Sequence, residues 1–221
     1  QIGRLLLRAA GEQPHSEQIF EIVAHLNRGG LLIEDSEERI QVARLNLDAA
    51  SRAREATAYQ AAQQYASDGL SLLAGTLAGT QLEELRFALT KELAQASNLT
   101  GEHERSEKLL HHLLEQLSLM AGRGPDSHRA LAQRQVELYS LLIAQYTLTG
   151  RYEQAIAAGR KALGLLGIGL PDPTANQAAA VAIFIVFLIR GSPGYRFTPF
   201  DLVVYSLASV KLGKEEANPV I

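Results

Sequence analysis

A spacing that recurs three times along the chain limits what this sequence can fold into. Tyr59, His103 and Tyr152 each begin a stretch with helical periodicity, and they are separated by 44 and 49 residues. A small residue follows each of them by three positions, and leucines follow by eleven and fourteen positions. Apolar residues also precede each of them by ten and fourteen positions. In that order the positions are Ala62, Ser106 and Ala155; Leu70, Leu114 and Leu163; Leu73, Leu117 and Leu166; Ala49, Leu93 and Leu142; and Leu45, Leu89 and Leu138. Independent helices rarely keep one register on both sides of a turn, so we predict three copies of a helix pair.

The clearest copy is Tyr139–Pro171. Its first helix carries one stripe of apolar residues, spaced three and four apart: Tyr139, Leu142 and Tyr146. Gly150 allows the backbone to reverse without a Cβ penalty, and Ala155 is small enough for the two helices to pack closely. This pattern resembles a tetratricopeptide (TPR) repeat. The resemblance implies an all-α fold, a right-handed superhelix of antiparallel helix pairs, here with about nine or ten helices.

Periodicity and stop signals place the other helices. Asp35 with Glu38 resembles a capping box that starts a long helix, and a break follows near Glu55–Thr57. The loop Gly122–Asp126 is the strongest in the chain. The remaining predicted helices cover Ile2–Ala10, Ser16–Leu26, Ala58–Leu73, Leu82–Leu99, Glu102–Leu119, Ala130–Leu148, the apolar stretch after Thr174, and Phe200–Leu212.

Composition bounds the class of protein. The chain is 47% hydrophobic, so it has enough apolar residues for a sizeable core. Its 21 basic and 24 acidic residues are interspersed, and a net charge of −3 argues against a nucleic-acid partner. The apolar run Ala178–Ile189 has twelve residues, short of the roughly 20 that span a bilayer, so we expect no membrane span. No signal peptide or initiator methionine is present, and we expect a cytoplasmic fragment of a larger polypeptide.

A second resemblance rests on four motifs that follow one another in order. They are His25-Leu26-Asn27-Arg28-Gly29; Leu45-Asn46-Leu47-Asp48-Ala49-Ala50; Ala58-Tyr59 with Ala62, Tyr65 and Gly69-Leu70; and Leu165-Leu166-Gly167-Ile168 with Leu170-Pro171. Over residues 2–171 this order resembles the helical region after the ATPase module in large bacterial signalling proteins of the STAND class. The resemblance implies a parent that joins a serine/threonine kinase domain, the ATPase, this region, a GAF domain and a histidine kinase. The resemblance assigns no catalytic residue to this chain, because the ATP-binding and kinase motifs of the family lie in its other domains.

The two resemblances give a domain plan. We expect residues 1–34 to form an N-terminal helix pair leading out of an upstream ATPase module, residues 35–173 to form the TPR-like repeats, and residues 174–221 to form a helix pair that closes the solenoid.

Candidate sites for chemistry are few, and we predict no catalytic, cofactor-binding or metal-binding residue. His103, Glu107, His111 and Glu115 share one helix face, with His112 beside it, at a spacing that suits zinc. We interpret them as a polar surface, because Tyr59 and Tyr152 hold the position equivalent to His103 and are expected to pack against the preceding helix. His25 is expected to stabilise a loop by pairing with Asn27. The glycine-rich stretch Gly164–Gly169 follows a helix rather than a strand, and the chain has no phosphate-binding loop.

These observations favour a non-catalytic scaffold that binds a protein, a peptide or neighbouring domains of its own polypeptide and regulates a signalling ATPase or kinase. One alternative is a small-molecule sensor with a pocket between helices, near Phe184, Phe187 and Phe200. A metal-dependent or other enzyme is the third hypothesis.

Overall fold

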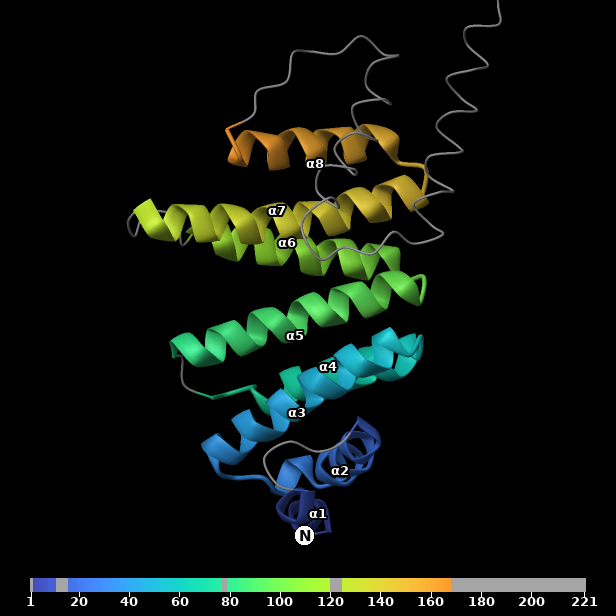
Figure 1. The fold of residues 1–221 in the computed structure, drawn as a ribbon, viewed down its shortest axis with the longest axis vertical. Helices are drawn as coiled ribbons and strands as arrows, with labels where there is room; N and C mark the ends of the chain where they lie inside the picture. Colours follow the sequence, from blue (N-terminus) through green and yellow to red (C-terminus); the bar gives the residue numbers. More distant parts are fainter. Residues whose placement is uncertain (1, 11–15, 77–78, 120–124, 168–221) are drawn as a thin grey trace, which may run out of the picture. The chain divides into compact units, whose positions relative to one another are not determined.

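The computed structural model describes residues 2–10, 16–76, 79–119 and 125–167. This part of the chain is entirely helical, with eight α-helices and one 3₁₀ turn and no strand (Figure 1). The elements are α1 (Ile2–Ala10), α2 (Ser16–Arg28), η1 (Gly30–Leu32), α3 (Ser36–Glu55), α4 (Tyr59–Leu72), α5 (Thr80–Leu99), α6 (His103–Leu119), α7 (Pro125–Leu148) and α8 (Tyr152–Leu165). The all-α prediction is confirmed for these residues. The helices predicted after Thr174 and at Phe200–Leu212 lie outside them.

The chain divides into two compact units, and the boundary between them in the sequence falls at Leu113–Leu114, within α6. The three predicted domains, 1–34, 35–173 and 174–221, remain a prediction. Among the described helices, none is long and apolar enough to cross a membrane.

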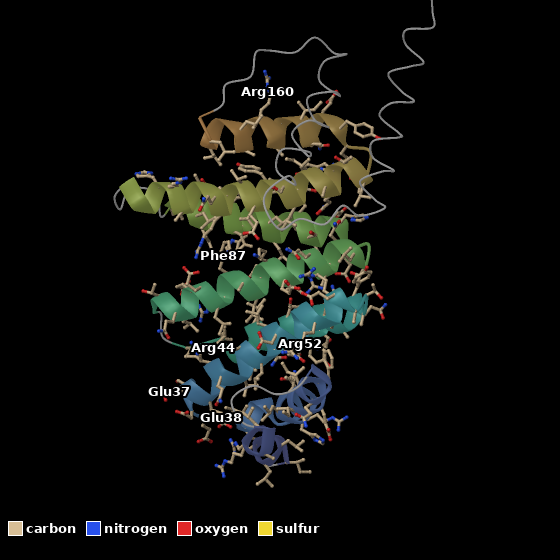
Figure 2. All side chains as sticks on the ribbon, viewed as in Figure 1. Glu37, Glu38, Arg44, Arg52, Phe87 and Arg160 are labelled. Carbon is tan, nitrogen blue, oxygen red and sulfur yellow. The ribbon has the colours of Figure 1, made fainter. Side chains whose placement is uncertain are left out.

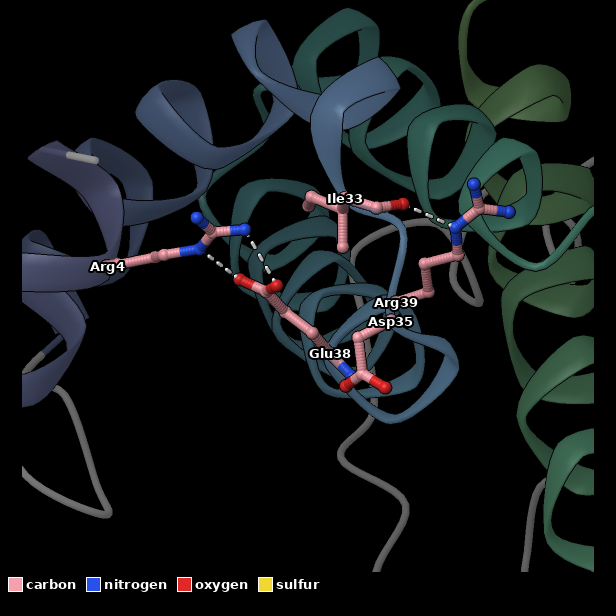
Figure 3. Close-up of polar contacts among 5 residues, drawn as sticks. All are labelled: Arg4, Ile33, Asp35, Glu38 and Arg39. Atoms are coloured by element: carbon pink, nitrogen blue, oxygen red, sulfur yellow. Dashed lines mark hydrogen bonds and ion pairs between the residues drawn. The ribbon is translucent and has the colours of Figure 1, made fainter.

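The start of α3 is fixed by its cap and by an ion pair to α1. The Asp35 carboxylate accepts a hydrogen bond from the Glu38 backbone N–H at 2.9 Å, as an N-cap residue should (Figure 3). The Glu38 side chain points to α1 instead, where it receives Nε and Nη2 of Arg4 at 2.5 and 2.8 Å (Figure 3). Half of the predicted capping box is therefore present, because Glu38 pairs with a guanidinium on another helix.

Small residues let α3, α4 and α5 approach closely. Ala53, Ala62 and Ala96 come one from each helix, pack into one cluster and are at most 2% exposed. Ala50, Ala66 and Leu93 form a second such cluster. Larger apolar residues fill the space beyond, chiefly Ile22, Leu26, Ile33, Val42, Leu72, Leu73, Leu82, Leu85 and Leu89. The first unit is therefore held by contacts among α2, α3, α4 and α5.

Three helix-to-helix turns share one backbone geometry. At the ends of α3, α5 and α7 the residue in the left-handed region is Thr57, Gly101 and Gly150, with φ of 62°, 88° and 73°. The next residue donates its N–H to the carbonyl five positions back, at 2.8 Å in all three turns: Ala58 to Ala53, Glu102 to Ser97 and Arg151 to Tyr146. These bonds define a Schellman motif, which closes a helix by satisfying its last carbonyls. The turns recur at the predicted offsets of 44 and 49 residues.

Burial supports the register of the repeat. Ala62, Ser106 and Ala155 are each at most 1% exposed. The apolar positions before the turns are buried or half-buried in every copy. Leu166 is the exception at 49% exposure, whereas its equivalents Leu73 and Leu117 are buried.

α7 begins earlier than the sequence suggests. We predicted a loop through Asp126 and a helix from Ala130, whereas the helix starts at Pro125. A proline is well suited to the first helical turn, because its fixed φ matches a helix and its missing N–H would have no partner there.

The second unit is described for α7 and α8, which pack against each other. Their buried residues are Leu138, Leu142, Ile143 and Tyr146 on α7 and Ala155, Ala158, Ala162 and Leu163 on α8. The Arg151 guanidinium lies 4.6 Å from the centre of the Tyr146 ring, over the turn that joins the helices. The predicted close approach of the two helices at Ala155 is consistent with its exposure of 1%.

Candidate functional site

Three of the four ordered sequence motifs converge on one polar cluster in the first unit. Asn27, near the end of α2, and Asn46, in the middle of α3, exchange amide hydrogen bonds of 2.8 and 2.9 Å. Asn27 also donates to the Asp68 carboxylate of α4 at 2.9 Å. Asn46 is fully buried and donates further to the Val42 carbonyl at 3.0 Å. Asn27 and Asn46 belong to the quoted motifs, and Asp68 directly precedes the motif residue Gly69, so residues far apart in the sequence link three helices.

Gly69 makes this convergence possible. A Cβ at this position would lie 2.8 Å from Leu89 Cδ2, closer than real Cβ atoms approach, and 3.1 Å from Asn46 Cβ, which is tighter than most Cβ contacts. Glycine therefore allows α4 to lie against α3 beside Asn46, with α5 supplying Leu89 on the other side. Close helix packing therefore explains the glycine of the Gly69-Leu70 motif.

Asp68 is the charged member of the cluster. Its Oδ2 accepts from Asn27, and its Oδ1 accepts from the Gln64 side chain at 2.8 Å. Both donors are neutral amides, so neither offsets the negative charge of the carboxylate. Burial raises the pKa of the neighbouring Tyr65 phenol above its ordinary value, and the negative charge of Asp68 raises it further. The centre of the Tyr65 ring lies 5.8 Å from the centre of the Phe20 ring of α2.

A hollow opens beside this cluster. Its volume is about 320 Å³, and its lining residues are Asn27, Gly30, Arg39, Asp68, Ser71 and Leu72. They come from the end of α2, the η1 turn, the first turn of α3 and the last turns of α4. The site is therefore built from four elements of one unit.

Arg39 reaches the hollow because its side chain is tied to the η1 turn. Its Nε donates to the Ile33 carbonyl at 2.7 Å, and the two terminal nitrogens extend beyond that bond (Figure 3). Within the described residues, neither terminal nitrogen has a hydrogen bond or an ion pair. The guanidinium is thus oriented while its outer edge stays open to a ligand.

Among the histidine and glutamate residues that we weighed as zinc ligands, one contact reaches outside the group and one lies within it. His103 Nδ1 lies 2.8 Å from the Asn98 Oδ1, and His111 Nε2 lies 3.9 Å from Glu107 Oε1. In the part of the chain that the structure describes, no group of three or more histidine, aspartate or glutamate side chains could hold a metal ion. Tyr152, which shares the repeat position of His103, is 44% exposed and so packs less than we expected.

Two other expectations fare differently. The pairing predicted between His25 and Asn27 is wrong, because the Asn27 amide bonds to Asn46 and Asp68, on helices that the sequence does not place beside it. Gly164–Gly169 begins at the end of α8, as predicted, and Gly167 has a φ of 76° there. The pocket proposed near Phe184, Phe187 and Phe200 lies outside the described residues.

Sequence reasoning missed Arg39 and Asp68 as members of a site. Asn27 and Asn46 belong to the quoted motifs. The available signal for a polar contact was an asparagine beside a leucine in each of these two motifs. Arg39 and Asp68 carried none, since each is one charged residue among many on a helix surface.

Comparison with known proteins gives one informative match. No protein-family model matches the chain. The chain is similar to hybrid signal transduction histidine kinase G of Dictyostelium discoideum, with 28% identity over 160 residues. The match covers 69% of this chain and 4% of the kinase, so the chain spans a small part of that relative's length. A segment similar to this chain is therefore part of a signal-transduction protein.

Proposed function

We propose that the chain is a non-catalytic helical-repeat scaffold within a larger cytoplasmic signal-transduction protein. Its helix pairs stack as a TPR-like superhelix and bind a partner protein or another part of the same polypeptide. Binding there regulates the ATPase and kinase modules that the STAND-like resemblance implies.

The observation that carries this proposal is the Schellman turn that recurs at residues 57, 101 and 150. A repeated turn with repeated buried positions is the construction of proteins that stack helix pairs into extended binding surfaces. The similarity to a small part of a histidine kinase supports the signalling setting.

An exposed polar surface on the first unit suits a partner. Glu37, Gln41, Arg44 and Asp48 are exposed and follow one face of α3 at spacings of four and three residues, and Figure 2 shows Glu37 and Arg44 along that helix. Arg44 Nη2 donates to Gln81 Oε1 of α5 at 3.4 Å. The exposed face therefore continues from α3 onto α5, and each of these is the first helix of its predicted pair. We call this surface, Glu37, Gln41, Arg44, Asp48 and Gln81, the α3–α5 face. Its mixed charge favours a polar protein partner over nucleic acid.

The test is a titration of the chain with the separately expressed segments that flank it in the parent polypeptide. We expect saturable binding to at least one flank, weakened about tenfold or more when Arg44→Glu and Asp48→Lys reverse the charges of the α3–α5 face. Gln60→Lys, on an exposed position of α4, is the matched control and should leave binding unchanged. Absence of binding to both flanks would contradict binding within the same polypeptide, and binding that ignores the charge reversal would contradict the role of the α3–α5 face.

A further inference from the structure

Two opposite charges line the hollow beside the Asn27–Asn46 pair without neutralising each other. Arg39 and Asp68 are both lining residues, yet among the described residues neither forms an ion pair. A guanidinium and a carboxylate that share a small concave space but do not pair leave two complementary positions for a ligand. Such a ligand carries one negative and one positive group.

Arg39 supplies the anion position. The bond from its Nε to the Ile33 carbonyl fixes the plane of the guanidinium, and the two terminal amino groups remain as a fork. That fork matches the two oxygens of a carboxylate, which it binds with two parallel hydrogen bonds.

Asp68 supplies the cation position. Each of its oxygens accepts one bond from a neutral amide, Asn27 or Gln64, which fixes the carboxylate and leaves further lone pairs for donors. Ser71 lies beside it, and its hydroxyl donates to the Ser67 carbonyl at 3.0 Å, so its oxygen also remains able to accept. A ligand ammonium has three N–H donors for these acceptors.

The size and charge of the hollow narrow the class of ligand further. A volume of about 320 Å³ lies at the small end of ligand sites, which span roughly 300–1,000 Å³, so the hollow suits a small ligand. A phosphate or sulfate ligand would bring its charge close to the Asp68 carboxylate, which disfavours it. Leu72 adds one apolar wall, against which a short side chain packs.

We propose that this hollow binds a free α-amino acid, with its carboxylate on Arg39, its ammonium on Asp68 and Ser71, and its side chain against Leu72. The site lies between the end of α2, η1, α3 and α4, so an occupied hollow ties these four elements together. The inference stands apart from the scaffold role, because it concerns a concave edge of the unit rather than the α3–α5 face.

The first experiment titrates the whole chain with each of the twenty L-amino acids by calorimetry. We expect saturable, one-to-one binding of at least one of them. The N-acetyl and the carboxamide derivatives of that amino acid, which remove one charge each, should bind at least about tenfold more weakly. A capped peptide with adjacent lysine and glutamate residues offers the same charges from a protein source, and it should bind more weakly than the free amino acid.

Variants then assign the contacts. Arg39→Gln and Asp68→Asn should each raise the Kd about tenfold or more, since each removes a charged partner of the ligand. Arg8→Gln and Glu21→Gln remove one positive and one negative charge from exposed positions of α1 and α2 outside the hollow, and should leave the Kd unchanged. Gly30→Val adds bulk at a lining position instead: a Cβ there meets Leu72 Cδ2 at an ordinary 3.6 Å, and the larger side chain is expected to weaken binding.

Circular dichroism shows whether each variant folds. Should Arg39→Gln fail to fold, Arg39→Lys keeps the charge but loses the fork, and is expected to weaken binding in a folded protein. The proposal is overturned if no amino acid binds saturably, if the blocked derivatives or the capped peptide bind as tightly as the free amino acid, or if binding survives Arg39→Gln, Asp68→Asn and Gly30→Val.

Discussion

Thr57 and Gly101 occupy the same place in two successive helix turns, and both have a left-handed backbone, with φ of 62° and 88°. Glycine adopts this conformation freely, whereas a β-branched residue is strained in it by roughly 1–2 kcal/mol. Thr57→Gly should therefore stabilise the chain by about 0.5–1 kcal/mol, after the greater unfolded-state entropy of glycine is subtracted. Thr57→Ala retains a Cβ and should bring little of this gain. Denaturant titration measures both, and a Thr57→Gly variant that is no more stable than wild type would refute a strained turn.

The half-buried Asn27 and the fully buried Asn46 should behave as a unit. Removing either amide leaves the other with unsatisfied groups, so Asn27→Ala and Asn46→Ala should each cost about 1–3 kcal/mol. The double variant should cost less than the sum of the two, by at least about 0.5 kcal/mol. Gln64→Ala removes an exposed amide that also bonds to Asp68, and should stay within about 0.5 kcal/mol of wild type. Strict additivity in this double-mutant cycle would show that the two side chains are not coupled.

Two helical glycines should respond to alanine in different ways. At Gly164, near the end of α8, an added methyl group would meet no atom within 4 Å, so Gly164→Ala should gain up to about 1 kcal/mol from helix propensity. Gly69→Ala gains the same propensity but drives a methyl group into the fully buried Leu89, an overpacking that typically costs about 1–3 kcal/mol. We expect the free energy of unfolding of Gly69→Ala to be at least about 1 kcal/mol lower than that of Gly164→Ala, measured by thermal or chemical unfolding. Equal effects would mean that Leu89 moves aside without cost.

Ala155 offers a test of the repeat register in α8. It is 1% exposed, so Ala155→Trp should cost at least the roughly 1–3 kcal/mol of an overpacked core. Ala157 is exposed two positions later on the same helix, and Ala157→Trp should be close to neutral. The melting temperatures of the two variants decide the matter, and a tolerated tryptophan at position 155 would contradict the proposed register.

The Tyr65 phenol should make stability depend on pH in alkaline solution. Its pKa is raised first by burial and then by Asp68, so the native state keeps a proton that the unfolded chain releases. The free energy of unfolding should therefore be fully retained below about pH 10, the pKa of an unfolded tyrosine, and should fall as pH rises beyond it. Asp68→Asn should lower the Tyr65 pKa part of the way, measured by phenolate absorbance against Tyr65→Phe. An unchanged Tyr65 titration in Asp68→Asn would show that the carboxylate does not act on the phenol.

The sequence predicted those parts of the fold that depend on local signals. Helix periodicity, the Asp35 cap and the break after Glu55 are properties of short stretches, and the described helices begin and end close to the predicted residues, apart from the start of α7. The left-handed residue at position 57 was harder to foresee, because threonine rarely adopts this conformation and gives no turn signal of its own.

Contacts between distant residues were beyond reach of the same reasoning. His25 was paired with Asn27 because they are neighbours in sequence, whereas Asn27 bonds across the fold to Asn46 and Asp68. Arg39 enters the hollow because the Ile33 carbonyl holds its side chain, a bond that depends on how the η1 turn folds. Only the packing of α2, α3 and α4 brings these groups together.

The constant turn sets where this kind of chain tolerates insertions and deletions. α6 is three residues longer than α4, at 17 against 14, and α7 is four residues longer than α5, at 24 against 20. Each difference is close to one helical turn of about 3.6 residues, so the added length keeps the same face of the helix inward. A single inserted residue would instead rotate the rest of the helix by about 100°. The buried residues beyond the insertion would then no longer face the neighbouring helix. The helices of such chains should therefore differ in length by whole helical turns, at the helix ends away from the Schellman turn. Engineered insertions should be placed at these ends and in steps of about three or four residues.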